Sequence, residues 1–280
     1  MRALILALLL LAAPLAAPVA AAPQLVHLGA RHYLIEMPDH PTGAMILVLH
    51  GGGGTPAQFA DMTGFSAPAL AEGYAVIYPA ASQPKRITMW QTDVEKPGRA
   101  DDFGFLDQVT RDAATRFQLD PARIYMSGFS NGAAMAEAYA MARAGRIKAV
   151  AAVSGTLDLR RTLQAQPMLI IHGTADPRVP YQGGRGAKSK VKTSFDAIPA
   201  QVMALVAAFG DLSQADRLID PVDDGMQVTQ SDYSNGQGVQ LRLLSISGGG
   251  HGWPGRLSPK PKASDISATA EALRFFALHP

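Results

Sequence analysis

The sequence Gly-Phe-Ser-Asn-Gly at 128–132 places a serine at the centre of a G-x-S-x-G pattern. This pattern is typical of a sharp turn that joins a strand to a helix and exposes a nucleophilic serine. Apolar residues typical of a short strand precede it, and small residues typical of a helix follow it. Glycine on both sides of the serine relieves steric crowding where the backbone is strained. The pattern therefore predicts that Ser130 is a nucleophile at the start of a helix.

A serine hydroxyl is a weak nucleophile near neutral pH and needs an imidazole base, which a carboxylate orients. In α/β-hydrolases the order along the chain is serine, acid, histidine, each on a loop after a strand. His251 lies in a glycine-rich loop after the last expected strand, whereas His172 closes an apolar strand, where a structural role fits better. The other histidines precede the serine or lie beside the C-terminus: His27, His32, His40, His50 and His279. His251 is therefore the predicted base.

The acid is expected on a loop between Ser130 and His251. Asp176 directly follows a buried apolar strand and lies between Gly173 and Pro177. We expect its carboxylate to hold the imidazole in one tautomer and to stabilise the imidazole cation. The alternative acids lie in polar stretches, where a carboxylate is usually only solvated: Asp158, Asp220, Asp223, Asp224 and Asp232.

Stabilising the oxyanion of acyl transfer requires two backbone N–H donors aimed at the developing negative charge. One is expected from Asn131, the residue after the serine. The other is expected from the glycine run at 51–54, which follows an apolar strand, with Gly52 and Gly53 as equal candidates. A phosphate-binding loop is also conceivable, but no Lys followed by Ser or Thr comes directly after these glycines, as that loop requires.

The elements that must position these residues alternate between strands and helices. Apolar runs typical of buried strands occur at 44–49, 74–78, 123–127, 147–153 and 167–171, and later strands are expected at 226–233 and 239–246. Helices are expected at 56–70, 101–117, 131–143, 199–209 and 265–278. The alternation predicts an α/β-hydrolase fold, with a mostly parallel central sheet and helices on both faces. We expect one catalytic domain over residues 23–280.

The first 22 residues are typical of a secretory signal peptide. A short basic start is followed by an apolar run at 3–13 and by small residues up to Ala22, with a small-x-small cleavage site at 19–21. A transmembrane anchor would need about 20 apolar residues, and two prolines disfavour it. We expect a secreted or periplasmic protein that does not associate with membranes after the signal is removed.

Composition excludes several other classes of protein. The formal net charge is only +2, and no dense basic stripe interleaved with aromatic residues occurs, so we expect no nucleic-acid partner. The chain has no cysteine, which excludes a thiol nucleophile and a Cys-ligated metal site. We expect no cofactor and no metal, and the oligomeric state is not indicated. The basic residues of one cluster are typical of a solvated loop: Arg185, Lys188, Lys190 and Lys192.

Four separated motifs carry a family resemblance. They are His-Gly-Gly-Gly-Gly at 50–54, Gly-Phe-Ser-Asn-Gly at 128–132, His-Gly-Thr-Ala-Asp at 172–176 and Gly-Gly-His-Gly-Trp-Pro-Gly at 249–255. Together they resemble the polyhydroxybutyrate depolymerase/feruloyl esterase family. The resemblance implies an α/β-hydrolase fold and a secreted serine esterase with Ser130, Asp176 and His251 as its catalytic triad. Family members often carry cysteines and append a polymer-binding domain. The sequence shows neither, so small-molecule or oligomeric esters are the expected substrates.

Trp90 and Trp253 are candidates for the substrate pocket, although each is equally suited to anchor the core. Two other functions remain open. A secreted α/β-hydrolase peptidase usually adds a large gating domain, for which 280 residues leave no room. A non-catalytic ligand-binding member of the fold generally lacks one of the three catalytic residues, and all three occur here.

Overall fold

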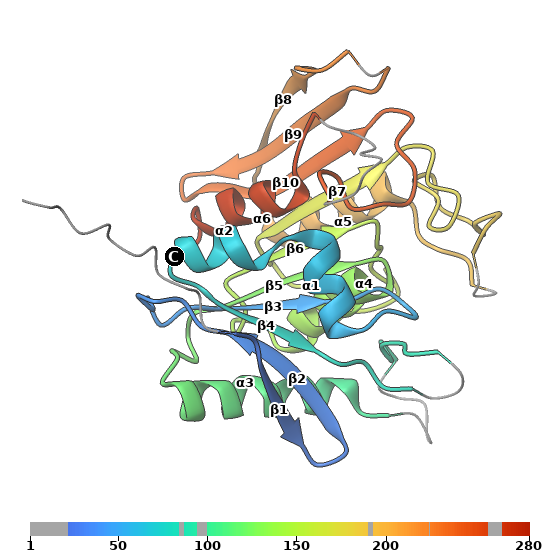
Figure 1. Ribbon diagram of the computed structural model, residues 1–280. Helices are drawn as coiled ribbons and strands as arrows, with labels where there is room; N and C mark the ends of the chain where they lie inside the picture. The colour runs from blue at the N-terminus through green and yellow to red at the C-terminus, as the bar shows by residue number, and fades with distance from the viewer. Residues whose placement is uncertain (1–21, 84–86, 94–99, 190–192, 224, 257–264) are drawn as a thin grey trace, which may run out of the picture.

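The computed structural model describes residues 22–83, 87–93, 100–189, 193–223, 225–256 and 265–280. A ten-stranded sheet runs through this part of the chain in the order β1-β2-β4-β3-β5-β6-β7-β10-β9-β8 (Figure 1). The strands are β1 Gln24–Leu28, β2 Arg31–Glu36, β3 Met45–Leu49, β4 Ala75–Pro79, β5 Ile124–Phe129, β6 Ala149–Val153, β7 Met168–Gly173, β8 Ser213–Ile219, β9 Val228–Asn235 and β10 Gly238–Ile246. The helices are α1 Pro56–Thr63, α2 Ser66–Ala71, α3 Asp102–Phe117, α4 Asn131–Ala142, α5 Ile198–Phe209 and α6 Ala268–Phe276.

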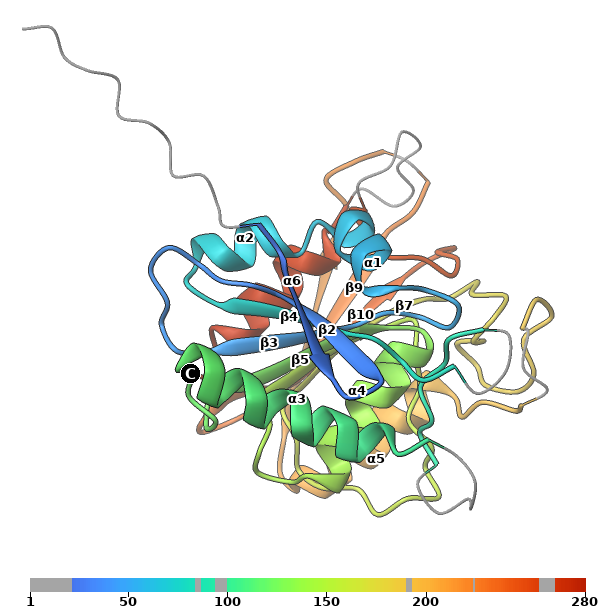
Figure 2. The same cartoon turned by 60° about the horizontal axis from the view of Figure 1, so that its bottom comes forward.

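The six central strands, from β4 to β10 in sheet order, pair in parallel, and two antiparallel strands complete each edge. Helices α3, α4 and α5 cover one face, and α1, α2 and α6 cover the other (Figures 1 and 2). Strand β3 shows the consequence: Met45, Leu47 and Leu49 face one layer, whereas Ile46 and Val48 face the other. Strands buried on both faces are continuously apolar. The predicted α/β-hydrolase fold is therefore confirmed.

Two elements differ from the sequence prediction. The helix expected over 56–70 is divided into α1 and α2, because α1 ends at Gly64 in a left-handed conformation, with φ 57°. Strand β8 was not predicted. Almost all of its residues are exposed, and it pairs only with β9 at the edge of the sheet, so the alternation that marks a half-buried strand is missing.

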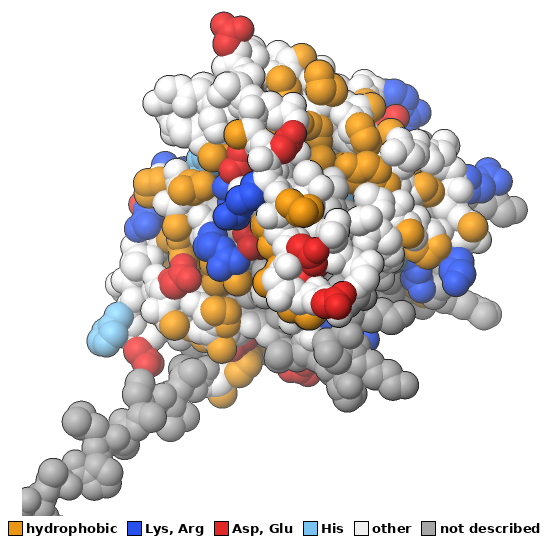
Figure 3. All heavy atoms as spheres, turned by 90° about the horizontal axis from the view of Figure 1, so that it is seen from above, with side chains coloured by type: hydrophobic (Ala, Val, Ile, Leu, Met, Phe, Trp, Pro, Cys, Tyr) orange, Lys and Arg blue, Asp and Glu red, His pale blue; other side chains and the backbone are white. Residues whose placement is uncertain are grey.

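On the face seen from the β8 side, acidic and basic side chains are interspersed with apolar ones (Figure 3).

Some expectations concern residues outside the described part of the chain. The signal peptide predicted over 1–22 falls there except for Ala22, and so do Lys190, Lys192 and Asp224. Among the described residues, no helix combines the length and the apolar character needed to cross a membrane. The same residues contain no group of three or more His, Cys, Asp or Glu side chains placed to hold a metal ion.

A carboxyl group lies fully buried between α4 and α5. The Glu137 side chain accepts a hydrogen bond of 2.5 Å from the Gln201 amide nitrogen, and Gln201 is also fully buried. Burial raises the pKa of Glu137 to about 8, although the hydrogen bond from Gln201 opposes this shift. Glu137 is therefore a neutral acid below about pH 8 in the folded protein.

We predict that this carboxyl makes the free energy of unfolding depend on pH. The folded pKa is raised above the unfolded value of 4.5, so the folded state binds the extra proton between these two values. Stability then falls by roughly 1 kcal/mol per pH unit as pH rises through this range, and levels off above it. Glu137→Gln removes the effect, so the melting temperature of the variant relative to the wild type should rise from about pH 5 to about pH 8. Parallel melting curves across this range would contradict the prediction.

Candidate active site

Ser130 lies in a strained turn between β5 and α4. Its backbone has φ 56° and ψ −119°, a conformation that L-residues rarely adopt, and its N–H donates to the Val153 carbonyl at 2.8 Å. A Cβ at Gly128 would collide with the Gly132 carbonyl, and a Cβ at Gly132 would collide with the Leu49 carbonyl. Both glycines of the pattern are therefore required by close backbone contacts, as the sequence suggested.

The three predicted catalytic side chains lie in hydrogen-bond contact. The His251 Nε2 atom is 3.0 Å from Ser130 Oγ, and the Nδ1 atom is 2.7 Å from Asp176 Oδ2. A carboxylate only accepts hydrogen bonds, so Nδ1 carries the proton and Nε2 accepts from the serine hydroxyl. The ring of Phe129 packs beside the imidazole, with the centroids 4.9 Å apart. This arrangement can transfer the hydroxyl proton of Ser130 to His251.

The surroundings of Asp176 favour its ionised form. Burial by itself would raise the pKa of this carboxyl, but the hydrogen bond and charge of His251 hold the pKa below its usual value. Backbone N–H groups of Arg178 and Val179 add to the effect, because both donate to Asp176 Oδ1, at 2.8 and 2.9 Å. The second carboxylate oxygen thus remains available to the imidazole.

His172 supports the loop that carries the acid. Its Nε2 atom donates to the Val179 carbonyl at 2.8 Å and lies 3.5 Å from Asp176 Oδ2. Burial lowers the pKa of His172, so the ring is neutral near pH 7 and the contact with Asp176 is not an ion pair. This placement agrees with the structural role expected for His172.

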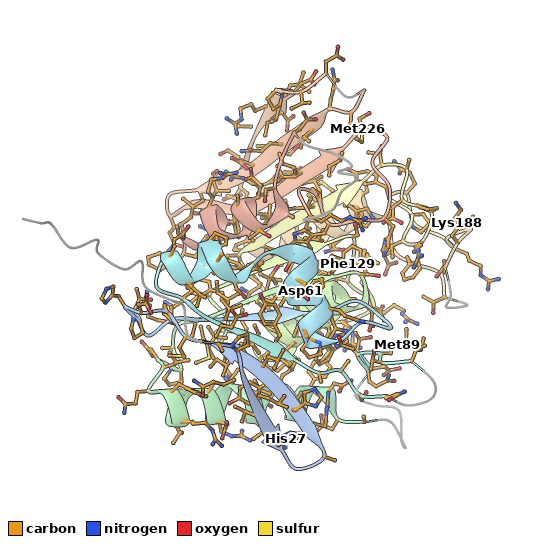
Figure 4. All side chains as sticks on the ribbon, viewed as in Figure 1. His27, Asp61, Met89, Phe129, Lys188 and Met226 are labelled. Carbon is orange, nitrogen blue, oxygen red and sulfur yellow. The ribbon has the colours of Figure 1, made fainter. Side chains whose placement is uncertain are left out.

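The acid and the base come from adjacent parallel strands. Strands β7 and β10 pair with Gly173 opposite Ile246, so the loops that follow them leave the same edge of the sheet. The Thr174 N–H donates to the Ile246 carbonyl at 2.9 Å, and the Ala175 N–H donates to the Gly249 carbonyl at 2.9 Å. In Figure 4 the labelled Phe129, Met89 and Lys188 lie on this side of the molecule, toward which the strands point.

The three residues predicted as oxyanion donors differ in their position and in the hydrogen bonds of their N–H groups. Asn131 is the first residue of α4, where backbone N–H groups lack partners within the helix. Gly52 lies beside it, since a Cβ added to Gly52 would be 3.9 Å from the Asn131 Cβ, and both residues border the cleft described below. Gly53 does not fit, because its N–H donates to the Thr88 carbonyl at 2.8 Å. Gly52 is therefore the remaining candidate for the second donor.

The Asn131 side chain has a role that the sequence did not reveal. Its Oδ1 accepts from the Trp90 backbone N–H at 2.7 Å, and its Nδ2 donates to the Trp90 carbonyl at 3.1 Å. The Trp90 indole N–H donates to the His50 carbonyl at 2.9 Å. These bonds connect the start of α4 with the glycine loop that follows β3. The sequence offered no signal for them, because the partners are 41 and 40 residues apart.

The two tryptophans proposed for the substrate pocket differ in position. Trp90 borders the cleft, and its side chain is also part of the core. Trp253 is only 2% exposed, packs edge-on against Phe59 and Phe65, and donates through its indole N–H to Thr269. Trp253 is therefore a core residue and not part of the cleft wall, contrary to the pocket role considered from the sequence.

Ser130 and Asn131 border a cleft of about 1610 Å³. Its apolar lining includes Ala134, Ala138 and Met141 of α4, with Leu157 and Val179. Its polar lining includes Thr92, Thr156, Arg160, Arg161, Gln164 and Asp196. Both kinds of surface therefore lie within one cleft beside the serine. A cleft of this volume has room for an ester much larger than an acetate.

Comparison with known proteins identifies the family. The pattern of the phospholipase/carboxylesterase family matches residues 30–205, which is more than half of the chain. The chain belongs to this family. As a family member it is a serine hydrolase acting on carboxylic ester bonds, which agrees with the position of Ser130 in the turn.

Two relatives of this carboxylesterase were found by sequence. NocK of Nocardia uniformis subsp. tsuyamanensis, which is named as an esterase, is 28% identical over 239 residues, covering 79% of this chain and 69% of NocK. The bifunctional acetylxylan esterase/xylanase XynS20E of Neocallimastix patriciarum is 27% identical over 158 residues, covering 55% of this chain and 22% of XynS20E.

Solved structures show the same fold at low sequence identity. The acetyl xylan esterase from Aspergillus awamori has a TM-score of 0.63 and 14% identity, covering 92% of this carboxylesterase and 100% of that chain. A carboxylesterase from Mesorhizobium loti has a TM-score of 0.57 and 17% identity, covering 92% and 99%. At these identities the likeness supports the fold alone.

We predict that Asp176→Asn lowers kcat by roughly 10³–10⁴-fold, because an amide cannot stabilise the imidazole cation or select its tautomer. Circular dichroism should remain that of the wild type. Asp232→Asn is the matched control, since Asp232 pairs with Arg242 on the β9–β10 ladder and should retain kcat within about twofold. Equal losses in both variants, measured on a 4-nitrophenyl ester, would contradict the role of Asp176.

We also predict that Gly132→Ala prevents normal folding. The added Cβ would collide with the Leu49 and His50 carbonyls, which are backbone atoms and cannot rotate away. The cost is expected to be about 3 kcal/mol or more in the free energy of unfolding. Gly236→Ala is the control, because its Cβ would meet nothing within 4 Å. Similar melting temperatures for the two variants would contradict the prediction.

Proposed function

We propose that this family member is a secreted carboxylic ester hydrolase that works through an acyl-enzyme, with Ser130 as nucleophile, His251 as general base and Asp176 as the orienting acid. The observation that carries the proposal is the unbroken hydrogen-bonded series from Ser130 Oγ through His251 to Asp176 Oδ2. Transfer of the hydroxyl proton to the imidazole, which the ionised carboxylate orients, makes a serine hydroxyl nucleophilic at neutral pH.

In the first half-reaction, Ser130 Oγ attacks the carbonyl carbon of the ester while His251 Nε2 takes the hydroxyl proton. The tetrahedral intermediate places its negative charge near the N–H groups of Asn131 and Gly52. The start of α4 contributes a favourable dipole at the same place. His251 then gives its proton to the alcohol as that group leaves, and the acyl group stays on Ser130.

In the second half-reaction, His251 activates a water molecule that attacks the acyl-enzyme carbonyl. The carboxylic acid leaves and Ser130 regains its proton from His251. Asp176 remains ionised throughout, since its pKa lies below its usual value. No cofactor takes part in these steps.

The proposed substrates are soluble or oligomeric esters of the kinds attacked by polyhydroxybutyrate depolymerases and by feruloyl or acetylxylan esterases. The Gly-Gly-His-Gly-Trp-Pro-Gly motif at 249–255 supports this choice, as does the name of the relative XynS20E. The volume and mixed lining of the cleft also suit an ester with one large, polar group. We further propose export by a signal peptide over 1–22 and one catalytic domain over 23–280.

The test is covalent labelling with a fluorophosphonate probe, which reacts with an activated serine. The wild type should label, and Ser130→Ala should not. Ser127→Ala is the matched control, since Ser127 is a buried serine of β5 whose hydroxyl donates to the Ala151 carbonyl. This variant should label as the wild type does. A folded wild type that neither labels nor hydrolyses short 4-nitrophenyl esters would refute the proposal.

The substrate class is tested with a panel of feruloyl esters, acetyl-xylan and 3-hydroxybutyrate oligomers, with a peptide amide as the comparison. We expect turnover of at least one of these esters and none of the peptide amide. Preferential cleavage of the peptide would contradict the esterase proposal and favour a peptidase.

A further inference from the structure

The buried Glu137 and Gln201 side chains form a connected series that ends at the wall of the cleft. Glu137 Oε1 accepts from Gln201 Nε2 at 2.5 Å. Gln201 Oε1 in turn accepts from the Leu157 N–H at 2.9 Å and lies 3.0 Å from the Thr156 hydroxyl. Thr156 and Leu157 both border the cleft. The series therefore joins α4 and α5 to the loop that follows β6.

The orientation of the Gln201 amide follows from these contacts. The Leu157 N–H can only donate, so the oxygen of the amide must face it. The amide nitrogen is then directed to Glu137, which supplies the acceptor. Without this acceptor a buried donor would be left unpaired, at a cost in free energy.

A carboxyl group is an expensive choice at the Glu137 position. The side chain is fully buried, and within the described part of the chain its Oε2 atom has no hydrogen-bond partner. Burial raises the pKa of this carboxyl, and the hydrogen bond from Gln201 opposes that shift. An apolar side chain would avoid the desolvation cost. The presence of a carboxyl at this place therefore indicates a role in positioning Gln201 rather than in stabilising the fold.

The loop that Gln201 holds lies between the nucleophile and the base. Ser154 has φ 52°, and its hydroxyl donates to the Gly252 carbonyl at 3.3 Å, next to His251 in the chain. Gly155 packs so closely on Ser130 and Ala133 that a side chain would collide with them. The Ser154 N–H is held separately, by the Ile171 carbonyl at 2.9 Å. Thr156 and Leu157 are the residues of this loop that contact Gln201, and the Thr156 hydroxyl also lies 3.2 Å from the Asp196 carbonyl.

We propose that Glu137 is a positioning residue for substrate selection, acting through Gln201 to fix Thr156 and Leu157 on the wall that meets the larger part of the ester. This inference rests on the proposed function. It assigns no chemical step to Glu137. The pair instead sets the shape of the cleft beyond the reacting carbonyl, so its loss affects the binding of large esters more than that of acetate.

The experiment compares Glu137→Leu, Gln201→Leu and Glu137→Gln on three esters: 4-nitrophenyl acetate, 4-nitrophenyl octanoate and acetylated xylo-oligosaccharide. The two leucine variants should raise KM for at least one large ester by roughly fivefold or more relative to acetate, with kcat on acetate little changed. Glu137→Gln keeps an oxygen acceptor for Gln201 and should restore the KM ratio of the wild type.

Leu205→Ala is the matched control for general destabilisation, because Leu205 is a fully buried core residue of α5. It should lower the melting temperature without changing the KM ratio. An unchanged ratio in both leucine variants would overturn the proposal, as would an equal change in Leu205→Ala. Fluorophosphonate labelling is measured in parallel. A wild type that fails to label would refute both the proposed function and this inference. Normal labelling with an unchanged KM ratio between large esters and acetate would refute this inference alone.

Discussion

The strained backbone of Ser130 is the constraint on which the rest of the site depends. A φ of 56° at a non-glycine residue of this kind costs about 1–3 kcal/mol and persists only when its surroundings determine it. Here the surroundings are backbone atoms: the Val153 carbonyl accepts from the Ser130 N–H, and close contacts at Gly128 and Gly132 exclude any side chain. The parallel strands on either side of β5 thus hold the serine where the imidazole can reach it.

Hydrogen-bonded polar side chains, buried or partly buried, extend this constraint outward from the serine. Asn131 connects the start of α4 to the Trp90 backbone, His172 supports the acid loop, and Glu137 acts through Gln201 on the loop that follows β6. Each of these groups is costly to bury and is offset by specific hydrogen bonds. Together they define the position of loops that have little regular structure of their own. The loops that carry the site are therefore held in place by these hydrogen bonds.

The architecture was largely predictable because its signals are local. Continuous apolar runs indicated β3, β4, β6 and β7, since strands buried on both faces are largely apolar. Strand β8 could not be predicted, because its stability comes from pairing with β9 and not from burial of its own side chains. The division between α1 and α2 depends on Gly64, which in sequence is indistinguishable from a glycine tolerated within a helix.

For the site, the sequence alone determined the nucleophile candidate, the order of acid and base, and the need for glycine around Ser130, because these depend on residue type and chain order. Only the tertiary structure decided that the Gly53 N–H is engaged with Thr88 and that Trp253 belongs to the core. The same holds for the contact between Glu137 and Gln201, which are 64 residues apart. A hydrogen-bond partner is set by which chain segments meet in space, and this information is absent from local patterns.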